Sequence, residues 1–140
     1  MRMGTLAILG LAGAVLAGLP AAAQQAGEAV NVGAMEFVGA CAVCHGPTGK
    51  GDGPIARYLN VAPVDLTQLK KRNGGEFPFY KVFQMVDGRS LEGAHGTRAM
   101  PAWGRRFAAE AGDRYGPYGA ETVIRGRIVE MVRHLETLQE

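Results

Sequence analysis

The chain has few of the side chains that bind metals or nucleic acids. It carries two cysteines and three histidines, and its 15 basic and 13 acidic side chains leave a net charge of only +2. A structural zinc site needs four ligands, yet there is no second cysteine pair, and neither His95 nor His134 stands at the spacing of a compact zinc finger. The charge is far from the strongly basic balance typical of nucleic-acid-binding proteins. Both classes are therefore disfavoured, and we expect no nucleic-acid partner.

Convincing alternation of apolar and polar residues, the pattern of a half-buried strand, is also missing. Helical patterns are present instead, and at 140 residues the chain is long enough for one modest core. The sequence therefore predicts a single all-α domain. The expected helices cover Val30–Ala40, Gly53–Leu59, Thr67–Arg72, Phe77 or Pro78 to Val86, Arg105–Ala111 and Ala120–Leu138. In the last of these a buried stripe is expected at Val123, Ile124, Ile128, Met131, Leu135 and Leu138.

The first residues have the pattern of an export signal. One positive charge precedes an unbroken apolar run from Thr5 to Leu19, and the small residues Ala21–Ala23 follow it. We expect a signal peptide over residues 1–23, cleavage before Gln24, and a mature domain of residues 24–140 in the periplasm. The alternative is an uncleaved segment that anchors the chain in a membrane.

Both cysteines fall in one motif, Cys41-Ala42-Val43-Cys44-His45. Such a pair suits a redox-active disulfide, half of a zinc site, or two thioether bonds to a haem. A thioredoxin-type motif follows a hydrophobic strand, whereas the residues before Cys41 have the pattern of an amphipathic helix. The histidine directly after Cys44 favours the third chemistry, because two thioethers would bring it under the iron as an axial ligand. The motif predicts one covalent haem c, bound through Cys41 and Cys44 and ligated by His45.

The sixth iron ligand decides between an electron carrier and an open haem site. Three methionines, at positions 35, 85 and 131, lie on expected helical faces, where an apolar packing role is typical. Met100 differs because it stands in a loop rich in Gly and Pro, next to Pro101, which favours an extended and stiff presentation. We expect Met100 to be the sixth ligand. His95, in the same loop, is the competing candidate.

Taken together, Cys41, Cys44, His45 and Met100 resemble the haem-binding residues of the class I cytochromes c, the small monohaem electron-transfer family. The resemblance covers nearly all of residues 24–140. Two further positions match, since the family packs a glycine and an aromatic residue, eight and four residues before the first cysteine, against the last helix. Gly33 and Phe37 stand there. The resemblance implies several short helices wrapped around one covalently attached haem.

Two details concern single residues of this family pattern. The family uses a proline-adjacent carbonyl after the haem motif to accept the other N–H of the ligating histidine, and Pro63 is the candidate here. The last helix usually carries an aromatic residue where this chain has His134, which departs from the pattern. We interpret His134 as a packing residue in that place.

A haem iron held between two protein ligands lacks the open position that substrate chemistry needs. The resemblance therefore implies a one-electron carrier and not an enzyme. Its expected partners are a dehydrogenase or quinol-oxidising complex as donor and an oxidase or reductase as acceptor. Two alternatives stay open: a cytochrome subunit permanently bound to a dehydrogenase or oxidase, and a haem enzyme or ligand sensor with an open sixth site.

Overall fold

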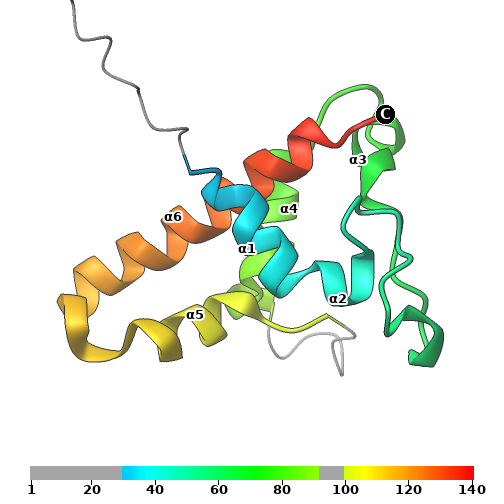
Figure 1. Ribbon diagram of the computed structural model, residues 1–140. Helices are drawn as coiled ribbons and strands as arrows, with labels where there is room; N and C mark the ends of the chain where they lie inside the picture. The colour runs from blue at the N-terminus through cyan, green and yellow to red at the C-terminus, as the bar shows by residue number, and fades with distance from the viewer. Residues whose placement is uncertain (1–29, 92–99) are drawn as a thin grey trace, which may run out of the picture.

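The structure is a computed structural model that describes residues 30–91 and 100–140 (Figure 1). The expected signal peptide 1–23, its cleavage before Gln24, and His95 lie outside the described residues. The α-helices are α1 (Val32–Ala40), α2 (Ala42–His45), α3 (Leu69–Arg72), α4 (Phe79–Asp87), α5 (Trp103–Ala111) and α6 (Gly116–Thr137). Short 3-10 turns are η1 (Ala56–Tyr58), η2 (Leu66–Gln68), η3 (Arg89–Leu91) and η4 (Gly112–Tyr115). No strand occurs within the two described ranges, which confirms the expected all-α class.

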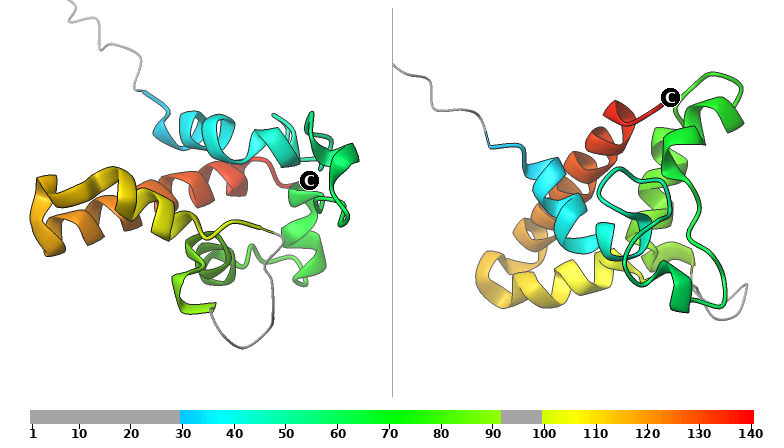
Figure 2. Two further views of the ribbon diagram at one scale, coloured as in Figure 1. Left: turned by 90° about the horizontal axis from the view of Figure 1, so that it is seen from below. Right: turned by 45° about the vertical axis from the view of Figure 1, so that its right-hand side comes forward.

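The longest helix, α6, organises the core. It packs against α1, α4 and α5, and Figures 1 and 2 show α1 lying across its C-terminal half. Its inward side chains are buried at Ile124, Ile128, Met131, Val132 and Leu135. The expected stripe is thus largely confirmed. Val123 and Leu138 are only partly buried, however, and Val132, which was not predicted as part of the stripe, is fully buried.

The crossing of α1 and α6 is unusually close at Gly33. A Cβ placed on Gly33 would overlap the backbone carbonyl of Glu130, so the two helix backbones meet directly. One turn further along α1, Phe37 is fully buried, and its ring centroid lies 5.4 Å from that of His134. The packing role expected of His134 is supported, because this contact places it where an aromatic side chain would pack.

The helix boundaries differ from expectation at several places. α6 begins at Gly116 instead of Ala120, because Gly116 adopts a positive φ of 62° and Pro117 suits the first turn of a helix. The short helix expected over 53–59 is reduced to the single turn η1. α4 ends at Asp87 with Gly88 in the left-handed conformation, one residue beyond the expected Val86.

The C-terminus is fastened to the segment that carries η2 and α3. The Glu140 N–H donates to the Thr67 carbonyl at 3.0 Å, and the Gln139 side chain donates to the Leu66 carbonyl at 2.9 Å. Lys50 adds an ion pair to Glu140 at 2.9 Å. The residues that follow α6 therefore hold in place the chain around Leu66, which lies beside the cavity described below.

We predict that Gly33→Ala lowers the free energy of unfolding by about 1–3 kcal/mol, the usual cost of forcing atoms into a packed contact. Denaturant unfolding measures this. Gly126→Ala in α6 is the matched control, because nothing lies within 4 Å of a Cβ there. The control should be neutral or slightly stabilising, since Ala is favoured over Gly inside a helix. An equal loss in both variants would contradict the role given to Gly33.

We predict that His134 makes the stability pH-dependent. Burial lowers the pKa of His134 below its ordinary value of 6.5, so as the pH falls the unfolded chain takes up this proton before the folded chain does. The free energy of unfolding should therefore fall as the pH drops below about 6.5. In His134→Phe this part of the fall should disappear while the Phe37 contact is kept. Denaturant titrations at several pH values between 5 and 8 compare the two slopes, and identical slopes would disprove the assignment.

Candidate functional site

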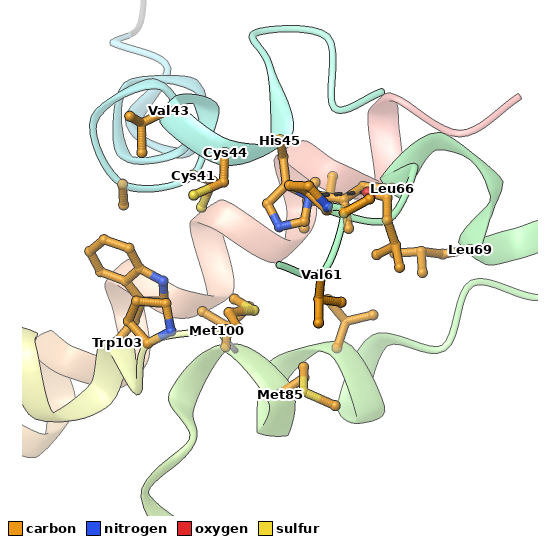
Figure 3. A pocket seen from close by; sticks show the side chains of 18 of the residues that line it. Cys41, Val43, Cys44, His45, Val61, Leu66, Leu69, Met85, Met100 and Trp103 are labelled. Atoms are coloured by element: carbon orange, nitrogen blue, oxygen red, sulfur yellow. Dashed lines mark hydrogen bonds between the residues drawn. The ribbon is translucent and has the colours of Figure 1, made fainter. Parts of the chain in front are cut away.

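A cavity of about 750 Å³ lies beside the cysteine motif, between α2, the chain from Ile55 to Leu69, α4 and the start of α5 (Figure 3). Its lining is mainly apolar. Aliphatic side chains include those of Val43, Val61, Leu66, Leu69, Val82 and Val86. This volume lies within the range of cofactor sites in proteins, which are typically apolar with a few placed polar groups.

The four residues expected to bind a cofactor all line this one cavity: Cys41, Cys44, His45 and Met100. The first three come together locally, because α1 ends at Ala40 with Cys41 as its C-cap and the single turn α2 follows, with the His45 N–H donating to the Cys41 carbonyl at 2.9 Å. Met100 comes from a segment distant in the sequence. Figure 3 shows it across the cavity from His45.

The Cys41 thiol lies against the core. Cys41 is 6% exposed, and its Sγ lies 3.3 Å from the Sδ of the fully buried Met131. Burial, followed by the charges of Cys44 and Glu36, raises the pKa of the Cys41 thiol to about 12. Redox-active cysteine pairs depend on a thiol whose pKa is lowered, so Cys41 lacks the property that such chemistry requires.

His45 is oriented by a backbone hydrogen bond. Its Nδ1 lies 3.1 Å from the Val64 carbonyl oxygen, which leaves Nε2 as the ring nitrogen available for a ligand. Burial lowers the pKa of His45, and the bond to Val64 opposes this in part. The neutral imidazole, which is the form that binds metals, is therefore favoured.

The acceptor expected for His45 was a proline-adjacent carbonyl, with Pro63 as the candidate, and the structure places it one residue further on, at Val64. The Pro63 carbonyl lies against Gly51, where a Cβ would overlap it. Gly51 has a φ of 84° and its N–H donates to the His45 carbonyl at 2.8 Å. Because the Pro63 carbonyl is turned toward Gly51, the next carbonyl, that of Val64, faces the imidazole.

A second methionine also lines the cavity. Met85, on α4, is 46% exposed and takes part in the lining together with Met100. The helical pattern around Met85 predicted a packing role, because that pattern alone gives no sign that α4 borders a cavity. Met131 is fully buried as expected, whereas Met35 is 66% exposed and does not fill the core.

Charged and aromatic groups complete the lining. Trp103 is 7% exposed and borders the cavity beside Cys41, as Figure 3 shows. Three cationic side chains, Arg72, Lys81 and Arg106, line it as well, and all three residues are exposed, which places them at its mouth. Arg72 and Lys81 were not predicted as site residues, because single basic residues on short helices carry no distinguishing signal.

Within the described part of the chain, no group of three or more His, Cys, Asp and Glu side chains could hold a bare metal ion. A haem iron needs axial ligands rather than such a cluster, and the lining of the cavity includes the imidazole of His45 and the thioether of Met100. Among residues 30–91 and 100–140 there is no helix of the length and apolar character that crossing a bilayer requires. Comparison of the chain with protein-family models, curated proteins and solved structures found no match.

Proposed function

We propose that the chain is a class I c-type cytochrome, a periplasmic one-electron carrier with one haem c. The observation that carries the proposal is the meeting of Cys41, Cys44, His45 and Met100 at one apolar cavity. The motif residues are neighbours in the sequence, but Met100 is remote. Its place in the same cavity is the arrangement that axial ligation from two sides would need.

The side chains that meet at the cavity suit the binding of a haem c. Cys41 and Cys44 would hold the porphyrin edge through thioether bonds, and His45, oriented by the Val64 carbonyl, would give its Nε2 to the iron. Met100 would give its thioether sulfur from the other side. When bound, the haem supplies an iron that cycles between the ferric and ferrous states. The apolar lining would exclude water and favour this outer-sphere role.

The cations at the cavity mouth suit the two carboxylates of a haem. The porphyrin carries two carboxylates, and a carboxylate near an apolar surface is stabilised by a cation or a hydrogen-bond donor. Arg72, Lys81 and Arg106 offer such groups in a lining that is otherwise mainly apolar. Trp103 adds an indole N–H at the same wall.

The close crossing of α1 and α6 supports the same fold family. Gly33 meets the Glu130 backbone and Phe37 is buried at the crossing, as the resemblance implied for the first and last helices of class I cytochromes c. In this proposal the donor is a dehydrogenase or quinol-oxidising complex, and the acceptor is an oxidase or reductase. Each partner would approach the haem edge transiently.

We predict that the purified protein is low-spin and shows the near-infrared sulfur-to-iron charge-transfer band in its ferric state. Met100→Ala should abolish the band, because it removes the sulfur. Met85→Ala is the matched control, since it removes a sulfur from the same cavity, and it should keep the band. His95→Ala should keep it too. Optical and paramagnetic-resonance spectra measure these outcomes. A high-spin iron that binds carbon monoxide readily in the wild type would instead favour an enzyme or sensor.

We predict that the intact mass of the protein exported by a haem-attaching host equals residues 24–140 plus one haem. The double variant Cys41→Ala/Cys44→Ala should carry no covalent haem, because both thioether bonds are lost. Mass spectrometry under denaturing conditions measures both. A wild-type chain without the added mass would contradict the cofactor assignment, and a chain that keeps residues 1–23 would contradict cleavage.

A further inference from the structure

The guanidinium of Arg89 lies between two carboxylates. Its Nε is 2.5 Å and its Nη2 3.1 Å from the two oxygens of Asp87. Its Nη1 and Nη2 are 2.6 Å and 3.0 Å from the two oxygens of Glu121. Both pairs are therefore bidentate, the geometry in which arginine binds carboxylates most strongly. The hydrogen bonds that Arg89 donates to Glu121 and to Asp87, in that order of importance, raise the pKa of Arg89, while Arg89 lowers the pKa of Glu121.

These ion pairs join three helices at one point. Asp87 is the last residue of α4, Arg89 begins η3, and Glu121 lies near the start of α6. The first turn of α5 meets them at Gly104, where a Cβ would overlap the Asp87 carboxylate and lie 2.7 Å from the Nε of Arg89. We call these four residues, Asp87, Arg89, Gly104 and Glu121, the Arg89 clamp.

The clamp lies directly behind two walls of the cavity. Val86, which precedes Asp87, lines the cavity from α4, and Trp103, which precedes Gly104, lines it from α5. Met100 and Pro101 belong to the same wall as Trp103. The separation of the α4 wall from the Met100 wall is therefore set where Asp87 and Arg89 meet Gly104.

We propose that Arg89 is a positioning residue for Met100: by bridging Asp87 and Glu121 it holds the start of α5 against the end of α4, and so keeps the Met100 sulfur in place as an axial ligand. This inference rests on the proposed function, because it concerns the sixth ligand of a bound haem. Axial ligation requires a side chain to stay at one place relative to the porphyrin. A small separation of α4 from α5 is expected to weaken it before the fold is lost.

The Asp87 carboxylate makes this clamp sensitive to loss of the arginine. Its side chain is 12% exposed and Arg89 is its ion-pair partner. Removing one partner of a mostly buried ion pair leaves an unpaired charge that must be solvated, and this usually moves the surrounding structure. Here the nearest structure is the first turn of α5, three to four residues after Met100.

The chain contains a matched control at the other end of α5. Arg127 also bridges two carboxylates, Glu36 at 2.6 Å and Glu110 at 2.8 Å, and its side chain is 27% exposed against 28% for Arg89. It joins α1, α5 and α6, and neither it nor its two partners line the cavity. Replacing Arg127 therefore removes a comparable bridge without touching the wall that carries Met100.

The test uses the ferric haem-loaded protein and its affinity for added imidazole, which competes with Met100 for the iron. Imidazole titrations, followed through loss of the sulfur-to-iron band, compare Arg89→Gln, Arg89→Lys and Arg127→Gln with the wild type. We expect Arg89→Gln to bind imidazole about tenfold more tightly, a change ordinary for coupling between two sites. Arg127→Gln should match the wild type. Arg89→Lys should lie between them, because lysine keeps the charge but not the bidentate geometry.

Thermal unfolding of each variant separates positioning from general stability. Glu121→Gln gives a milder break of the same clamp, because Glu121 is 44% exposed, and it should raise imidazole affinity in the same direction. Equal imidazole affinity in Arg89→Gln and the wild type, or an equal rise in Arg127→Gln, would overturn the positioning role while leaving the proposed function intact. A wild-type protein without the sulfur-to-iron band would overturn both.

Discussion

The direct contact between the backbones of α1 and α6 is the constraint on which the rest of the molecule depends. Only a residue without a Cβ fits at position 33, because the Glu130 carbonyl occupies that space. The contact fixes the direction in which α1 runs, and α1 delivers Cys41 and the turn of α2 to the cavity. α6 in turn supplies the buried stripe for α4 and α5 and fastens its own end to the chain around Leu66. One close approach thus places both the core and the site.

Local signals were enough to predict the fold class and the motif. The helical period of α6 and the order Cys41, Cys44, His45 are written in adjacent residues, so no knowledge of tertiary packing is needed to interpret them. The first turn of α6 was missed because Gly116 and Pro117 resemble a loop, although a positive φ followed by proline also begins a helix. The Val64 carbonyl and the position of Met85 depend on how the loop after His45 folds back and on where α4 lies. Those are properties of the assembled chain.

The two proposed iron ligands, His45 and Met100, are kept in place in different ways. His45 is fixed by neighbours in sequence and by one hydrogen bond to Val64, whereas Met100 reaches the cavity from the segment just before α5, far from His45 in the sequence. In the proposed carrier, the cysteine motif and His45 would keep the porphyrin edge in place. The contacts that hold Met100 would set how firmly the sixth iron position stays occupied. Arg89 and Arg127 fix opposite ends of α5: Arg89 holds the end beside the site, and Arg127 holds the end beside the core.

The sulfur of Met131 touches the sulfur of Cys41 from within the core. Met131 is fully buried on the helix that also crosses α1, so the deepest layer of side chains adjoins the point where the porphyrin edge would be attached. A change of side-chain volume at that depth would shift the attachment itself and alter the electrostatic surroundings of the iron. In the proposed carrier, variation in the hydrophobic core would therefore act on electron affinity, and the potential would change without any substitution at a ligand or at the surface.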